Sequence, residues 1–476
     1  MTVAYCCRGE ALNPRADTPA RHLVFLPLVT RGANGELEGK LAQSWEHSAD
    51  WREWTYHLRP NVRWHDGVPV TAHDVEFTLN LLRHPDVLML SPEFFESISV
   101  LDDLTLRVRY AGPTFGFDWW LVYYPKHLLE GLDPKEFYKW EFWTNPVGNG
   151  PYRFVRYVPE TAMEFEANPE YYPGKPRIER VVLKFVGDAA LTELLSEKVD
   201  AVTDVDPSEI PKLAGDPRFR IFHRPHEYTV RGIYWQNDYS LFSDPQVRRA
   251  LTLAIDRQEL LQVMNLPRDF PIVDGPYTDR QLHLGELPEP LPYDPERAQA
   301  LLEAAGWRDR DGDGVRERDG QEFRFTAIAM ADPGWEELTV YVQDRFRRVG
   351  VRMEIQTLAA GVVREKFYGG EFEAAFTWVR HFPGDLRHEY GEDSPLGYVN
   401  SEVVALADRA ALTADPDVQD RISRELTEIF RADLPVTRLF PHVTTVAAHR
   451  RILGLSSPYQ TDPVWYMEKL WLEEDR

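Results

Sequence analysis

The chain has 476 residues, of which 43% are hydrophobic and 12% aromatic. A single hydrophobic core stops growing at about 250–300 residues, so two or more lobes are expected, and the apolar content excludes an intrinsically disordered protein. The formal net charge of −23 argues against nucleic-acid binding, which depends on the neutralisation of phosphates by Lys and Arg.

The first residues, "MTVAYCCRGEALNP", show no basic region followed by an apolar one, so no signal peptide is visible. This predicts either a cytosolic protein or a mature form with an added start Met. The two cysteines, Cys6 and Cys7, are adjacent, which excludes a disulfide framework. They form either a vicinal disulfide or two small side chains in or beside a strand.

A helix is predicted over residues 73–83, where Val75, Leu79 and Leu82 recur at helical spacing and Thr71 precedes them as an N-cap candidate. Alternating apolar and polar residues predict strands at 104–110, at 161–169 and, leading into a loop, at 228–242. Short connections between elements are expected, since the chain has 36 prolines and 29 glycines.

The second half of the chain mixes predicted helices with predicted strands. Helices are predicted at 243–264, 294–306, 335–350, 401–412 and 416–435, and strands at 322–330, 351–358 and 374–379. The helix that ends in Gly350 is followed at once by a strand, and such a junction is typical of α/β proteins.

His57, His65 and His73 recur every eight residues beside two aspartates, which raises the question of a metal site. A compact site usually places two His at short helical spacing with a carboxylate nearby, whereas these three fall on a predicted strand, a turn and a helix start. We therefore interpret "HDG" as a tight turn that ends at Gly67, with metal ligation as the alternative.

The segment "DRDGDGVRERDG" resembles a calcium-binding loop, because Asp309, Asp311, Asp313 and Gly314 match its positions 1, 3, 5 and 6. Position 12 requires a bidentate Glu, and Gly320 stands there. A solvated turn between a helix and a strand is the favoured interpretation, and calcium binding the alternative.

No enzymatic motif is found. The segment "PVGNGPY" (146–152) lacks the Lys and Ser/Thr of a phosphate-binding loop, so a backbone turn is predicted there. Neither a G-x-S-x-G elbow nor an H-E-x-x-H pair occurs, and nothing marks Cys6 or Cys7 as an activated nucleophile.

Five stretches of the chain, taken in order, match one family pattern. They are 41–82, which includes "LRPNVRWHDGVPVTAHDVEFTLNLL"; 146–186, which begins "PVGNGPYRF"; 244–261, "DPQVRRALTLAIDRQELL"; 293–307, "YDPERAQALLEAAGW"; and 397–410, "GYVNSEVVALADRA". Together they resemble the family 5 extracellular solute-binding proteins of ABC transporters, the peptide/nickel class. On this resemblance the His-Asp stretch belongs to a structural signature of the first lobe.

The resemblance implies an α/β, two-lobed periplasmic-binding-protein fold of class II type around a ligand cleft, with an extra subdomain in lobe I. Lobe I would take residues 1–225 plus 440–476, with the inserted subdomain at about 43–165, and lobe II residues 226–439. It also implies a monomer without catalytic activity, cofactor or metal. Its partners would be a solute and a membrane permease, in the periplasm or at the outer face of the cell membrane, with the signal peptide removed.

The expected ligand residues come from the same resemblance. In peptide-binding members a W-x-x-D motif supplies a carboxylate for the ligand's α-ammonium, and the aligned stretch here is "TWVRHFPGD". Trp378 keeps the aromatic position and is followed by Val379 and Arg380, but His381 stands where Asp is expected. Asp385 lies four residues further on and would replace it only in a rebuilt loop.

A buried ammonium without a carboxylate partner costs several kcal/mol, so this departure bears on the ligand. Arg380 and His381 suit hydroxyls, carboxylates or other acceptors, unless they point away or pair with acids such as Asp385. In lobe I, Asp17 and Thr18 follow "LNP", where the family contacts its ligand.

Several functions remain open at this point. An oligopeptide is the ligand of most family members, an oligosaccharide is the second option, and a nickel chelate is the third. From other classes, a hydrolase with an unrecognised site and a non-transport sensor or chaperone remain as alternatives.

Overall fold

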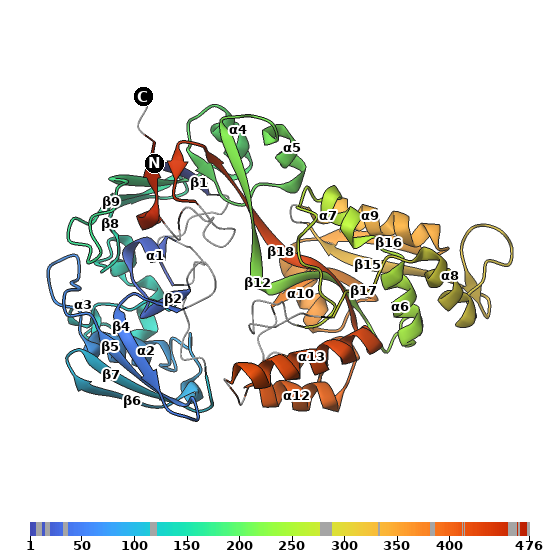
Figure 1. Cartoon of the computed structure of the whole chain (residues 1–476), viewed down its shortest axis with the longest axis horizontal. Helices are drawn as coiled ribbons and strands as arrows, with labels where there is room; N and C mark the ends of the chain where they lie inside the picture. The colour runs from blue at the N-terminus through green and yellow to red at the C-terminus, as the bar shows by residue number, and fades with distance from the viewer. Residues whose placement is uncertain are drawn as a thin grey trace. The chain divides into compact units, whose positions relative to one another are not determined.

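In a computed structural model, the chain forms two compact units, each with its own hydrophobic core. The structure describes residues 1–5, 12–14, 20–31, 37–114, 121–276, 288–331, 334–380, 386–411, 413, 415–455, 464 and 467–473. Unit 1 comprises residues 1–205, 212–224 and 444–476, and unit 2 comprises residues 206–211 and 225–443. Two of the boundaries fall inside long strands, β12 (Phe219–Trp235) and β18 (Val436–His449), which are traced in Figure 1.

Unit 1 is built on a mixed sheet whose central strand comes from the start of the chain. Its strands are, in spatial order, β11 (Ala201–Val202), β1 (Thr2–Tyr5), β10 (Arg180–Phe185), β9 (Ala162–Ala167) and β8 (Tyr152–Val158). β1 runs parallel to both of its neighbours, whereas β8, β9 and β10 form an antiparallel meander. Ala447 and Ala448, near the end of β18, pair with β11. The sheet of unit 1 therefore contains strands from both the start and the end of the chain.

A second, antiparallel sheet of unit 1 lies in the region predicted to hold an inserted subdomain. Its order is β4 (Ala42–His47), β5 (Glu53–Leu58), β7 (Thr105–Tyr110) and β6 (Phe95–Asp102), and α2 (Ala72–Leu82) contacts β6 and β7. Alternate residues of β5 and β7, such as Trp54 and Leu106, are buried, as the period-two pattern requires.

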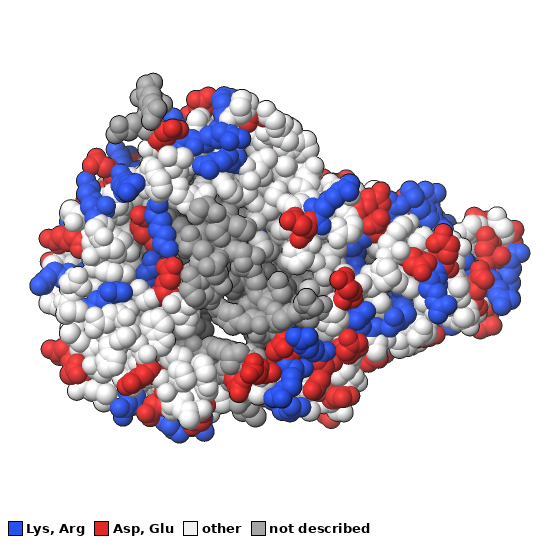
Figure 2. Space-filling model, in the orientation of Figure 1, with Lys and Arg blue, Asp and Glu red and all other residues white. Residues whose placement is uncertain are grey.

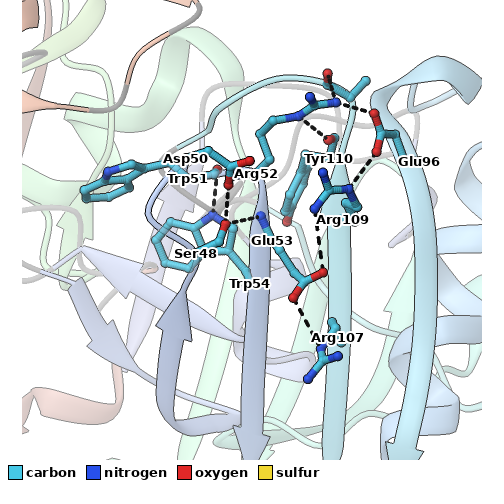
Figure 3. A network of polar contacts seen from close by, with 11 residues as sticks. Ser48, Asp50, Trp51, Arg52, Glu53, Trp54, Glu96, Arg107, Arg109 and Tyr110 are labelled. Carbon is cyan, nitrogen blue, oxygen red and sulfur yellow. Dashed lines mark hydrogen bonds and ion pairs between the residues drawn. The ribbon is translucent and has the colours of Figure 1, made fainter.

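The other face of this sheet carries a ladder of opposite charges, drawn in Figure 3. Arg109 lies between two acids, with its Nε 2.8 Å from an oxygen of Glu96 and its Nη1 3.8 Å from one of Glu53. Arg52 pairs with Glu96 at one end, and Arg107 lies 3.7 Å from Glu53 at the other. Exposed pairs of this kind are worth about 0–1 kcal/mol each, so the ladder supports strand register more than overall stability.

The smaller elements of unit 1 are short helices and two-stranded pairs. They are α1 (Arg21–Val24), α3 (Lys126–Leu129), α4 (Ala190–Leu195), the pair β2 (Val29–Arg31) and β3 (Leu37–Gly39), and the pair β19 (Ile452–Leu453) and β20 (Trp471–Leu472). α5 (Ile210–Leu213) lies at a unit boundary.

Unit 2 is an α/β layer structure. Its sheet order is β16 (Arg352–Leu358), β15 (Arg324–Met330), β17 (Ala374–Arg380), β12 and β18, with β15 parallel to both β16 and β17. Its helices are α6 (Pro245–Leu253), α7 (Arg257–Val263), α8 (Pro295–Ala304), α9 (Trp335–Arg348), α10 (Ala360–Tyr368), α11 (Leu386–Tyr390), α12 (Ser401–Ala411) and α13 (Pro416–Asp433). A hairpin of β13 (Glu317–Arg318) and β14 (Gln321–Glu322) follows α8.

Most elements predicted from periodicity are confirmed. The predicted helices at 73–83, 294–306, 335–350, 401–412 and 416–435 correspond to α2, α8, α9, α12 and α13, and the predicted strands to β7, β9, β12, β15, β16 and β17. Asp294 and Asp415 cap α8 and α13 by accepting backbone N–H groups, with Pro at the first helical position of each.

The single helix predicted over 243–264 is wrong, because the structure has two helices there. α6 ends at Leu253, and Asp256 adopts an extended conformation (φ −76°, ψ 94°). Its carboxylate accepts the backbone N–H of Glu259 at 2.9 Å and so starts α7. The hydrophobic period continues across the break, which is why the pattern alone did not reveal it.

Candidate functional site

Trp378, the aromatic residue of the family motif, lies near the end of β17. Its cross-strand partner on β12 is Arg231, and directly opposed residues project from the same face of a sheet. The ring of His442, on β18, stacks with that of Trp378, with centroids 6.0 Å apart and planes at 25°. These three side chains span three neighbouring strands of unit 2, and we call them the Trp378 row.

Arg231 is held tightly within this row and is only 7% exposed. Its Nε donates to Nδ1 of His442 at 3.1 Å, and its guanidinium carbon lies 4.7 Å from the ring centroid of Trp335 at the start of α9. Gly334 precedes that helix with φ +76°, and a Cβ there would lie 3.2 Å from Arg231 Nη1. Glycine therefore supplies both the left-handed backbone and the space for the guanidinium.

The remaining predicted ligand residues are placed only in part. The backbones of Val379 and Arg380 continue β17, paired with Val230 and Thr229 on β12. His381, Asp385, Asp17 and Thr18 lie outside the described residues. Their role in binding stays a prediction.

Sequence reasoning missed two members of the Trp378 row, Arg231 and His442. They lie 147 residues before and 64 residues after Trp378 in number, so only the strand register brings them together. The alternation of "TVRGIYW" places Arg231 on one face of its strand, but no local pattern says which residue of another strand faces it. His442 lies on β18, a strand that the sequence pattern did not predict and that contains Pro441.

His65 has a structural role. Its Nε2 donates to the carbonyl of Gly150 at 3.1 Å, and its Nδ1 accepts the N–H of Gly148 at 3.3 Å. Burial lowers the pKa of His65 to about 4, so the ring is neutral near pH 7. It joins the "HDG" turn to the "PVGNGPY" segment.

That segment is irregular backbone that leads into β8, and no hydrogen-bonded turn is found in it. A Cβ on Gly148 would lie 1.9 Å from the carbonyl oxygen of Val24, so the two backbones are in direct contact. Asn149 and Gly150 both donate their N–H groups to this carbonyl, at 2.9 and 2.7 Å. Strand β8 follows rather than a helix, which leaves no helix N-terminus for a phosphate.

The three regularly spaced histidines do not converge. His57 lies on β5, and His73, on α2, has its Nδ1 3.7 Å from Glu76 and its Nε2 3.9 Å from Asp103. Within the described ranges no His belongs to a group of three side chains close enough to share a metal ion. The three histidines thus lie on a strand, in a turn and on a helix.

The calcium-like loop is exposed and folds back on its own carboxylates. Oxygens of Asp309 accept the N–H groups of Gly312 and Gly314 at 2.8 and 3.0 Å, and single ligand atoms of Asp309, Asp311 and Glu317 lie within 4.8 Å of one another. In such a turn, side-chain carboxylates accept the backbone N–H groups of the same loop. We therefore keep the interpretation of a solvated turn.

We expect EDTA to change the melting temperature by less than about 2 °C, because a structural turn loses nothing on chelation, whereas removal of a tightly bound ion costs several kcal/mol. Calorimetric scans with EDTA and with added calcium would measure this. The matched variant Asp309→Asn keeps an acceptor for the turn but weakens ion binding. If calcium stabilised the native protein and not the variant, the loop would be a calcium site.

Unit 1 contains a cavity of about 30 Å³, lined by apolar side chains such as Leu26 and by His22, Lys40, Tyr171 and Glu468. Lys40 Nζ lies 2.9 Å from Glu468 Oε1, and although burial opposes it, attraction to Glu468 raises the pKa of Lys40. Burial lowers the pKa of His22 to about 3. The Lys40–Glu468 pair links the C-terminal segment to the N-terminal part of unit 1.

The charge of the chain argues against nucleic-acid binding. Figure 2 shows basic and acidic side chains interspersed over the face in view, and the net charge is −23. Among the described helices, none combines the length and the apolar character needed to cross a bilayer.

Comparison with known proteins agrees with this fold. A model of the bacterial extracellular solute-binding proteins, family 5 (middle region), matches residues 36–386. A Brucella ovis protein named for an ABC transporter peptide-binding role is 29% identical over 293 residues, which are 60% of this chain and 55% of that protein; the match thus spans just over half of that relative. The oligopeptide-binding protein AppA of Bacillus subtilis is 24% identical over 489 residues, covering 96% of this chain and 88% of AppA.

Two solved structures show the same architecture over the whole chain. AppA of Bacillus subtilis in complex with a nonapeptide has a TM-score of 0.77 at 21% identity and covers 100% of this chain and 99% of its own. NikZ of Campylobacter jejuni in complex with Ni(L-His) has a TM-score of 0.79 at 23% identity, with 99% of each chain covered. The predicted α/β fold of two-lobed periplasmic binding proteins is confirmed, and with the match over residues 36–386 the chain belongs to the bacterial extracellular solute-binding proteins of family 5.

Proposed function

We propose that this chain is the solute-binding component of an ABC importer. It captures an oligopeptide-type solute in the periplasm or at the outer face of the cell membrane and delivers it to a membrane permease. Family membership over residues 36–386 carries the proposal. Its action is binding without turnover, as a monomer, and the two compact units are its two lobes.

The solute contacts are proposed to lie at the end of β17. Trp378 is half-buried there, at the position of the family motif, and the segment that runs through Val379, Arg380 and His381 to Asp385 continues from it. Asp17 and Thr18 are the proposed contacts from the N-terminal part of the chain. The relatives span different ligands, since AppA was solved with a nonapeptide and NikZ with Ni(L-His).

The alternative within the same role is an oligosaccharide or another solute without a free ammonium group. His381 stands where peptide binders have an Asp, and the neighbouring Trp378 row contributes two rings and an arginine. Aromatic faces stack on the apolar faces of sugar rings as readily as on aromatic side chains. Mass spectrometry of the solute that copurifies with the protein decides between the two classes.

We expect di- and tripeptides with a free N-terminus to bind weakly, and N-acetylated peptides or neutral oligosaccharides to bind better. The change His381→Asp should improve the binding of free peptides by about 1–3 kcal/mol, the scale of a charge-assisted hydrogen bond. Isothermal titration calorimetry of both proteins with matched free and acetylated peptides measures the difference.

The control variant is Asp385→Asn, which removes the one nearby carboxylate of the motif region without a change of shape. A contrary result would be tight binding of free dipeptides by the native protein, with an affinity that Asp385→Asn lowers and His381→Asp leaves unchanged. Asp385 would then be the partner of the ligand's ammonium group. The peptide assignment would then stand and the argument from His381 would be wrong.

A further inference from the structure

A C-terminal segment of unit 1, residues 467–472, meets the β2–β3 pair through two ion pairs. Glu468 Oε1 lies 2.9 Å from Lys40 Nζ, and Lys469 Nζ lies 3.2 Å from an oxygen of Glu38. Two neighbouring residues of opposite charge thus face an acid and a base on the other side. An exchange of partners would bring Glu468 to Glu38 and the two lysines together, and such like-charge contacts are repulsive. The two ion pairs therefore specify a single docking position for the segment.

The segment has little structure of its own. It consists of one turn of 3₁₀-helix, Met467–Lys469, and the two-residue strand β20, and isolated helices this short are unstable in water. Met467 and Leu470 are buried in the core of unit 1, and Trp471 pairs with Leu453 of β19. The conformation of the segment therefore depends on its contacts with the rest of unit 1.

The β2–β3 pair is equally small. Each of its strands has three residues, and an isolated pair of strands is marginally stable at best. Thr30 of β2, Lys40 and Glu468 all line the cavity of unit 1, and atoms that line a cavity lack packing partners on that side. Because packing is incomplete here, the charges account for more of the attachment between the two elements.

The two ion pairs differ in burial. In the Lys40–Glu468 pair 14% and 13% of the side chains are exposed, against 36% and 34% for Lys469 and Glu38. An exposed pair contributes little, whereas the loss of one partner from a buried pair leaves an uncompensated charge. The Lys40–Glu468 pair is therefore the stronger of the two links.

We propose that residues 467–472 form a clasp that holds the β2–β3 pair in place, with the Lys40–Glu468 pair as its main link. The clasp and the β2–β3 pair open and close together as one local unit, at a lower free energy than the unfolding of the whole of unit 1. This unit joins the two ends of the chain, since 428 residues separate Lys40 from Glu468. The coupling goes beyond the proposed function and does not depend on the solute.

Hydrogen exchange of the full chain, measured by mass spectrometry, tests this coupling. Glu468→Gln keeps the shape of the side chain but removes its charge. Amides of residues 28–31, 37–42 and 467–472 should then exchange faster by a similar factor, about tenfold or more, because local opening becomes less costly. Amides of β5 and β7 should exchange as they do in the native protein.

The matched control is Glu179→Gln, which removes a charge from an exposed ion pair elsewhere in unit 1. Its partner is Lys175, and 79% of the Glu179 side chain and 47% of the Lys175 side chain are exposed. Exchange should stay at the native rate in this variant, because solvent already screens the pair.

Charge reversal gives the second test. Lys40→Glu and Glu468→Lys should each speed exchange in the clasp and in the β2–β3 pair, because each brings like charges together. The double variant restores opposite charges across the contact, so its exchange should return towards the native rate. If a single reversal prevents folding, Glu468→Gln and the double variant still provide the comparison.

The proposal is overturned if Glu468→Gln speeds exchange in residues 467–472 alone, because the β2–β3 pair would then be held without the clasp. A uniform acceleration that includes β5 and β7 would contradict it as well, since the variant would then destabilise all of unit 1. Exchange in the double variant as fast as in Glu468→Gln would show that attraction between the charges is not what holds the clasp.

Discussion

Asp274→Ala is expected to lower the free energy of unfolding of unit 2 by about 3–5 kcal/mol, the cost of leaving one partner of a buried ion pair uncompensated. Asp274 Oδ1 lies 2.6 Å from Arg257 Nη1, with 2% and 4% of the two side chains exposed. Its other oxygen accepts the N–H of Leu291 at 2.6 Å. The substitution would leave the Leu291 N–H without its acceptor and the buried Arg257 without a negative charge, with only the carbonyls of Arg438 and Leu291 as acceptors.

Urea denaturation followed by circular dichroism measures this loss, with the unit 2 transition fitted separately if the two units unfold in sequence. Asp408→Ala is the matched control, because its ion pair with Arg387 is exposed, with 40% and 65% of the side chains accessible. It should cost less than about 1 kcal/mol. Equal effects of the two substitutions would show that the buried pair makes no special contribution.

Acidification from pH 6.5 towards pH 4 should destabilise unit 1, because two of its histidines are held neutral by burial. The pKa of His65 falls from 6.5 to about 4 and that of His22 to about 3, so the unfolded chain binds more protons than the folded one in this window. Their contribution is complete above pH 6.5 and is lost as pH falls. For His65 alone the loss by pH 4 is about 3 kcal/mol.

The free energy of unfolding, measured as a function of pH, tests whether stability falls as the pH is lowered. His65→Gln keeps one donor and one acceptor for Gly148 and Gly150 but does not titrate, so its stability should fall less steeply between pH 6.5 and 4. His73→Gln, at a site where 47% of the His side chain is exposed, should follow the native curve. A native curve that is flat over this interval would contradict the buried, neutral assignment.

Local patterns predicted the helices well, because capping residues and the hydrophobic period place the ends of a helix at nearly the same positions. α8 is an example: Asp294 and Pro295 start it, and Gly306 with φ +90° follows its end. The break before α7 escaped prediction because Asp256 caps a helix without interrupting the apolar period. Strand β18 escaped it because a strand with an internal proline has no strong local pattern.

The sequence predicted the position of Trp378 in the candidate site, but not the residues that contact it. Trp378 follows from the family motif, but Arg231 and His442 meet it only through strand register, which no single segment encodes. His65 is similar, since its partners Gly148 and Gly150 lie more than 80 residues away. Its burial and neutrality follow from contacts that a sequence pattern cannot show.

Unit 1 consists of three separate segments of the chain, which bears on the order in which the two units can fold during synthesis. Every residue of unit 2 has been made once the chain reaches 443, whereas unit 1 still lacks its last segment. That segment supplies the β18 partner of β11 and the carboxylate of Glu468 that pairs with Lys40. Domains generally fold from the N-terminus as they emerge from the ribosome. Here the unit that begins first is completed last, because β11 has no β18 partner until residue 448 has been made.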